Sequence, residues 1–136
     1  GIAKGYAVDC ALAVIGNEVD ATINAGGDLA MTRWHGCEVE IRTPSSGGRE
    51  TLKFPMGNQS LATSAAYFLQ SQQVIIDPHD LQKDTGKQSV SVFAESCMVA
   101  DALTKVGLLI SDPAGVMERF QATGIMISLE GSVKRF

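Results

Sequence analysis

Asp101 is the acidic residue whose sequence surroundings most suggest chemistry. It lies in Ala100–Thr104 (ADALT), inside a mainly apolar stretch. A carboxylate on a largely buried helix is costly unless it is paired or bound to a cation. Two interpretations remain open. Asp101 could form an ion pair with Lys105, one helical turn further on, or a hard-cation site with nearby hydroxyl or carbonyl oxygens. Spacing alone favours the ion pair.

A second candidate is the double-glycine segment Asn24–Asp28 (NAGGD), which follows a predicted strand. Glycines let the backbone adopt positive φ angles or approach a ligand closely, and exposed amides can hold a phosphate. The segment lacks the GxGxxG spacing of dinucleotide sites, and no predicted helix follows it. The spacing alone therefore favours a hairpin turn over a phosphate-binding loop.

Hydroxyl and carboxyl groups gather in two further segments. Thr63 and Ser64 lie in Ala62–Tyr67 (ATSAAY), where they could bind phosphate or bond to the local backbone. No histidine and acid stand at a readable spacing for a nucleophilic triad. Residues 77–80 (DPHD) could form a metal-binding loop, but Asp-Pro is also a common turn opener.

Two main helices are predicted to position these residues, one from Lys4 to about Gly16 and one from about Ser96 to Ile110. Ser96 is the predicted N-cap of the second helix. Apolar residues three or four positions apart predict the buried faces. These residues are Ala7, Cys10, Ala11 and Val14 in the first helix, and Met98, Ala102, Val106 and Leu109 in the second.

The rest of the chain predicts mainly strands. A short third helix is expected from Asp112 to about Gln121, with Asp112 as N-cap and Pro113 at the first helical position. Strands are expected at residues 21–24, 29–34, 37–43, 50–54, 59–63, 73–76, 89–94, 124–129 and 133–136. The predicted fold class is α+β, a single domain over residues 1–136 with an antiparallel sheet packed against two main helices.

Composition narrows the function classes. The 136 residues carry a net charge of −4, which gives no electrostatic case for nucleic acid or an anionic membrane. No apolar run has the length of a membrane span. The three cysteines match no CxxC pattern, so free thiols are favoured over a zinc site. The compartment is not predicted.

The segments above, in this order, resemble the FAD:protein FMN transferase family, also called ApbE. The family's G-x-I-A-K-G-Y-A-V-D segment is similar to residues 1–9 (GIAKGYAVD). The other similar segments are NAGGD at 24–28, ATSAAY at 62–67, VIIDP at 74–78 and ADALT at 100–104. In the family the first of these segments lies near the middle of the polypeptide. The chain therefore resembles a C-terminal half.

The resemblance implies a magnesium-dependent reaction in which FAD is cleaved, AMP leaves and FMN passes to a threonine of an acceptor protein. Cation and catalytic chemistry would centre on Asp101, with Thr104 and the Gly1 carbonyl as further metal ligands. Lys4 would face the cofactor. The other implied cofactor-binding residues are Asn24, Gly26, Gly27, Asp28, Thr63, Ser64, Tyr67 and Asp77.

Departures from the family pattern fall at the implied metal and phosphate positions. Lys105 stands where the family has a hydroxyl ligand, and an ammonium would take the cation's place beside Asp101. Val74 replaces a histidine and Ala65 replaces a glycine. Residues 79–81 replace the expected T-G, unless Thr85-Gly86 is its displaced counterpart. The pattern is typical of a retained scaffold with weakened chemistry.

Two functions therefore stay open: a relative of the flavin transferases, or a non-catalytic flavin-binding or protein-interaction module. A half-family chain is also expected to expose apolar surface or sheet edges that its other half would cover. This predicts a homo-oligomer.

Overall fold

The computed structural model describes residues 2–65, 75–76, 83–84 and 88–136. A six-stranded sheet runs through the molecule, with every neighbouring pair antiparallel. Its strands, in spatial order, are β1 (Thr22–Ala25), β2 (Asp28–Met31), β5 (Ser60–Ala65), β8 (Gln88–Ala94), β9 (Thr123–Ser128) and β10 (Val133–Arg135). The predicted sites at Gly1, Tyr67, Val74, Asp77, His79–Leu81 and Thr85–Gly86 lie outside the described residues.

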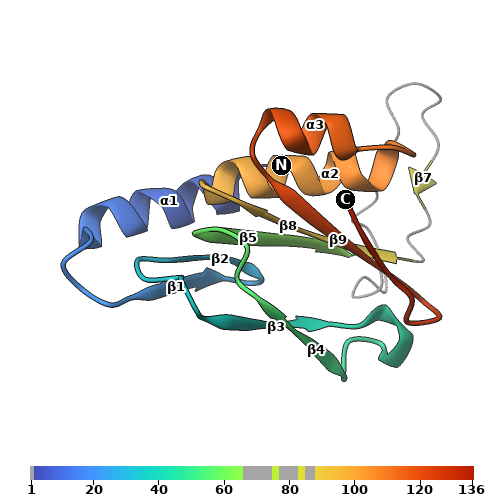
Figure 1. The fold of residues 1–136 in the computed structure, drawn as a ribbon, viewed down its shortest axis with the longest axis horizontal. Coiled ribbons are helices and arrows are strands. Elements are labelled where there is room, and N and C mark those ends of the chain that lie inside the picture. The colour runs from blue at the N-terminus through green and yellow to red at the C-terminus, as the bar shows by residue number, and fades with distance from the viewer. Residues whose placement is uncertain (1, 66–74, 77–82, 85–87) are drawn as a thin grey trace.

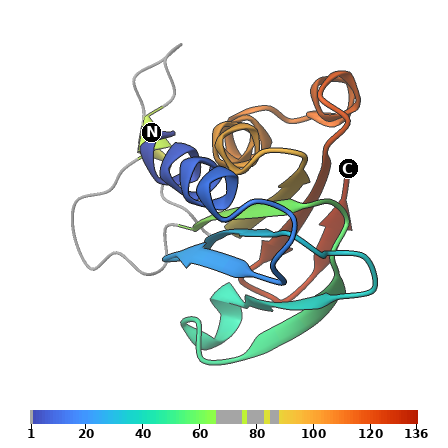
Figure 2. The ribbon, with the colours of Figure 1, turned by 90° about the vertical axis from the view of Figure 1, so that its left-hand side faces the viewer.

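Three helices lie on one side of this sheet, as Figures 1 and 2 show from two directions. They are α1 (Ala3–Ile15), α2 (Cys97–Leu109) and the short α3 (Ala114–Arg119). α2 packs on β5 and β8, and α1 packs on α2 and on β1 and β2. The α+β class predicted from the sequence is confirmed. Among the described residues, no helix has the length and apolar character needed to cross a membrane.

The opposite side of the sheet is covered by a separate hairpin of β3 (Glu38–Arg42) and β4 (Thr51–Pro55), joined through the 3-10 turn η1 (Pro44–Ser46). Alternation along β3 buries Val39 and Ile41 and exposes the charged residues between them. Both pack with Phe54 against the main sheet. A further short pair joins β6 (Ile75–Ile76) to β7 (Lys83–Asp84). Periodicity predicted the strands β3 and β4 but not that they form a sheet of their own.

Element ends differ slightly from the predictions. β2 ends at Met31, opposite the first residue of β1, so no ladder partner continues the strand to residue 34. The Ser96 cap of α2 is confirmed, because its hydroxyl accepts a hydrogen bond from the Val99 amide at 3.2 Å. α3 begins one residue later than predicted. Pro113 is its N-cap, and Asp112 accepts only a long 3.4 Å bond from the Ala114 amide.

The predicted buried face of α1 is wrong. Gly5, Val8 and Leu12 face the protein, whereas Val14 is 88% exposed. Gly5 allows α1 to lie directly on the start of α2, because a Cβ atom there would lie 2.5 Å from the Cys97 carbonyl oxygen. One helical turn later, Asp9 also contacts the start of α2.

Asp9 caps the N-terminus of α2 from outside that helix. Its two carboxylate oxygens accept hydrogen bonds from the amides of Cys97 and Met98, at 2.7 and 2.9 Å. Free amides and the positive end of the helix dipole both favour a carboxylate at this position. Gly5 and Asp9 therefore fix α1 against α2, and this fixes where Lys4 and Asp101 lie relative to one another.

Candidate functional site

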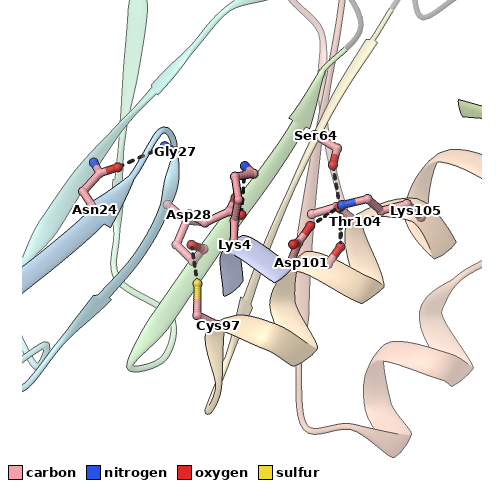
Figure 3. A network of polar contacts seen from close by, with 10 residues as sticks. Lys4, Asn24, Gly27, Asp28, Ser64, Cys97, Asp101, Thr104 and Lys105 are labelled. Carbon is pink, nitrogen blue, oxygen red and sulfur yellow. Dashed lines mark hydrogen bonds and ion pairs between the residues drawn. The ribbon is translucent and has the colours of Figure 1, made fainter. Parts of the chain in front are cut away.

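The candidate site gathers charged and hydroxyl side chains from segments far apart in the sequence (Figure 3). Lys4 comes from α1, Asp28 from the start of β2, and Ser64 from β5. Asp101, Thr104 and Lys105 come from α2. In Figure 3 Lys4 lies between Asp28 and the group on α2. Most of the site residues named by the resemblance that the structure describes thus lie together.

Asp28 is a buried carboxylate with one lysine partner. Its side chain is 1% exposed, and its Oδ2 atom lies 2.9 Å from the Lys4 Nζ atom. The Lys4 side chain is 58% exposed, so its ammonium reaches the buried acid from a solvent-facing position. This ion pair ties α1 to the β1–β2 hairpin and leaves the lysine accessible to a ligand.

Asp101 is a second buried carboxylate and is paired within its own helix. Its Oδ1 atom bonds to Lys105 Nζ, which also donates to the Asp101 main-chain oxygen at 2.9 Å. The Oδ2 atom is buried and has no hydrogen-bond partner among the described residues. Of the two interpretations that the sequence left open, the ion pair is the one that this structure contains.

Thr104 and Ser64 extend this cluster to the sheet. The Thr104 hydroxyl donates to the Asp101 main-chain oxygen at 2.7 Å, and it lies 2.7 Å from the Ser64 hydroxyl. A hydroxyl has one proton, so Ser64 is the donor in the second bond. Thr63 points to the other face of β5, as strand alternation requires, and pairs with Ser91 at 2.8 Å. The structure therefore brings Ser64, but not Thr63, to the Asp101 cluster.

The Asn24–Asp28 segment is a hairpin turn, the interpretation that spacing favoured. Gly26 and Gly27 form its two-residue loop with φ angles of 68° and 104°, the left-handed conformations that type I′ turns require. The Gly27 amide donates to the Asn24 side-chain oxygen at 3.0 Å. That amide is engaged within the turn, so the Asn24–Gly27 bond would have to open before this amide could hold a phosphate.

Cys97 is a buried thiol that the sequence pattern did not single out. Burial, followed by the negative charges of Asp28, Asp9 and Asp101, raises the pKa of its thiol from 9.0 to about 12. The three nearby carboxylates thus form a negative environment in which a thiolate is disfavoured. Cys97 is a packing residue at physiological pH, not a nucleophile.

Ionisation of the Cys97 thiol is expected to lower the free energy of unfolding at alkaline pH. The folded chain holds the thiol proton up to about pH 12, whereas the unfolded chain releases it near 9.0. The free energy of unfolding should therefore fall by up to about 1.4 kcal/mol per pH unit between those values. Urea unfolding of the wild type and of Cys97→Ala, measured at several pH values, isolates this slope. If the free energy of unfolding fell equally with pH in the two proteins, folding would not raise the pKa of the Cys97 thiol.

An open groove lies elsewhere on the helices. It is lined by α1, the start of α2 and Phe120, with Tyr6, Leu12 and Met98 among its residues. None of the site residues in Figure 3 lines it. In the described ranges, 2–65, 75–76, 83–84 and 88–136, no three His, Cys, Asp or Glu side chains form a metal-binding group.

Comparison with known protein families identifies the family of the chain. Residues 1–126 match the model of the ApbE family, a stretch that contains every residue labelled in Figure 3. The chain belongs to the ApbE family.

Solved structures support the same fold. The ApbE protein from Thermotoga maritima is 25% identical, with a TM-score of 0.73, and the match covers 98% of this chain and 49% of that one. A mutant of the flavin transferase ApbE from Vibrio cholerae is 23% identical, with a TM-score of 0.71, and the match covers 99% and 45%. The chain thus spans about half the length of these ApbE proteins. No curated protein matches the chain significantly.

Proposed function

We propose that this chain is a flavin-nucleotide-binding unit of the ApbE family, with the phosphate end of the nucleotide held at Lys4. The observation that carries the proposal is the convergence of Lys4, Asp28 and Ser64 beside the Asp101 cluster (Figure 3). Family membership supplies the ligand class, since a solved neighbour is named a flavin transferase.

Lys4 is the residue best suited to meet a phosphate. Its amine is exposed enough to reach a ligand, yet its position is held by the buried carboxylate of Asp28. A charge-assisted hydrogen bond from an ammonium to a phosphate oxygen is among the stronger polar contacts in proteins. Ser64 supplies a hydroxyl from the facing strand, which can donate to a phosphate once its bond to Thr104 opens. The remaining cofactor contacts, which stay proposals, are Asn24, Gly26, Gly27, Tyr67 and Asp77. Thr63 is no longer among them, because it lies on the other face of β5.

Flavin transfer is the second candidate function. The family resemblance implies cleavage of FAD, with FMN passed to a threonine of an acceptor protein. Retention of Asp101 and Lys4 in the family's positions favours this reaction, while the ion pair of Asp101 with Lys105 argues against its metal-dependent form. Release of AMP from FAD by the purified chain, with and without magnesium, distinguishes transfer chemistry from binding alone.

Replacing Lys4 by methionine is expected to weaken FMN binding by about tenfold, the loss of one charge-assisted contact. Riboflavin has the same ring system without the phosphate, so its affinity should change little. Flavin fluorescence titration measures both affinities. Lys134→Met is the matched control, because Lys134 is an exposed lysine on β10. Equal losses for FMN and riboflavin would mean that Lys4 does not meet the phosphate.

Self-association is also part of this proposal. α1 exposes Ile2, beside its first residue, together with Tyr6 and Val14, which are 48%, 59% and 88% exposed. Exposed apolar side chains on this helix would be covered by association with a second polypeptide, either another copy or an acceptor protein.

A further inference from the structure

Two oxygen atoms of Asp101 contact the Lys105 ammonium, and two hydroxyl groups lie beside them. Asp101 supplies a carboxylate oxygen and its main-chain oxygen to Nζ. The Thr104 hydroxyl donates to that same main-chain oxygen, and the Ser64 hydroxyl is bonded to the Thr104 hydroxyl. Carboxylate, carbonyl and hydroxyl oxygens are the ligands of hard cations such as Mg²⁺. In this protein, however, the cation beside Asp101 is the ammonium of Lys105, a side chain of α2 itself.

A divalent ion does not fit beside this ammonium. Mg²⁺ requires near-octahedral oxygen ligands at about 2.0–2.1 Å, and one of the two Asp101 carboxylate oxygens is already bonded to Lys105. Placing a dication next to the ammonium would add like-charge repulsion in a largely buried site, where screening is weak. Asp28, a second buried acid in the same region, is already paired with Lys4. The magnesium that the family resemblance implies therefore disagrees with the residues present.

We propose that Lys105 is a tethered cation that takes the place of the divalent ion, so that Asp101 is neutralised without a metal and this site binds no Mg²⁺. The Asp101 Oδ2 atom, which has no hydrogen-bond partner among the residues that the structure describes, is consistent with this substitution. The ammonium is a compact point charge, and of the two carboxylate oxygens it contacts only Oδ1. The inference concerns the metal alone and does not depend on flavin binding.

The test uses Mn²⁺ as the probe, because free Mn²⁺ gives an electron paramagnetic resonance signal that bound Mn²⁺ loses. The wild-type chain is expected to leave the signal of stoichiometric Mn²⁺ unchanged. Lys105→Thr replaces the ammonium with a hydroxyl ligand and is expected to bind Mn²⁺ at least about tenfold more tightly than the wild type. Adding Asp101→Asn to Lys105→Thr should abolish that gain.

Lys134→Thr is the control, since it removes the same charge from an exposed site on β10. Its Mn²⁺ affinity should equal that of the wild type. If Lys105→Thr does not fold, amide NMR signals of the wild type still test the inference. Mn²⁺ should then cause no selective broadening at Asp101, Thr104 or Ser64. Selective broadening there, or equal Mn²⁺ affinity of wild type and Lys105→Thr, would overturn the proposal.

Discussion

Gly5→Ala is expected to destabilise the chain by about 3 kcal/mol, the upper end of the usual effect of overpacking. The added Cβ would lie 2.5 Å from the Cys97 carbonyl oxygen and 2.8 Å from the Met98 Cα atom. Both are backbone atoms, so no side chain can move aside to make room. α1 would have to shift away from α2, and the Asp9 bonds to the α2 amides would lengthen. Urea unfolding measures the loss as a lower midpoint at an unchanged slope.

Gly115→Ala is the matched control for this substitution. Gly115 lies in α3 and has open space where a Cβ would be added. Alanine is a better helix former than glycine by about 1 kcal/mol, so this variant should be slightly more stable than the wild type. If Gly5→Ala were as stable as Gly115→Ala, the close crossing of α1 and α2 would not hold the site together.

Lys105→Met is expected to cost about 2 kcal/mol, less than the 3–5 kcal/mol typical of breaking a fully buried ion pair. The reduction reflects the Lys105 side chain, which is 31% exposed, whereas Asp101 is only 3% exposed. Removing the ammonium leaves a buried carboxylate without a counter-ion, and methionine keeps most of the aliphatic packing. Chemical unfolding gives the change in free energy, with Lys134→Met as the control on an exposed lysine.

A double-mutant cycle separates the ion pair from other effects of the substitution. Asp101→Asn removes the charge that Lys105 neutralises, so Lys105→Met should cost much less in that background. A coupling free energy of about 2 kcal/mol is expected. A coupling near zero would mean that the two side chains do not stabilise one another, and the tethered-cation inference would lose its physical basis.

Helix and strand positions followed from the sequence because glycines, caps and alternation mark them locally. The buried faces of the helices did not. α2 buries Asp101, Thr104 and Gly107 and exposes Ala102, which the apolar pattern had placed inside. A search for apolar stripes therefore misses inward positions that carry small or polar residues.

Gly5 shows the same difficulty on α1. Glycine has a low helix propensity, so the sequence alone gives no reason for Gly5 in α1. The close approach of α2 supplies that reason. Asp9 likewise reads as a surface acid until the start of α2 is placed against it. Their i, i+4 spacing was the available signal for a shared face. The grouping of Lys4 with Asp28 and Asp101 came from the family resemblance, since no local pattern links segments this far apart.

We propose that Lys4 and the Asp101 cluster form a flavin-phosphate site that needs no metal. Amide NMR of the labelled chain, titrated with FMN in excess EDTA, is the decisive experiment. We expect saturable shifts centred on Lys4, Asp28 and Ser64, and no change when magnesium replaces EDTA. Shifts confined to the groove at Tyr6, Leu12 and Met98, or shifts that appear only with magnesium, would contradict it.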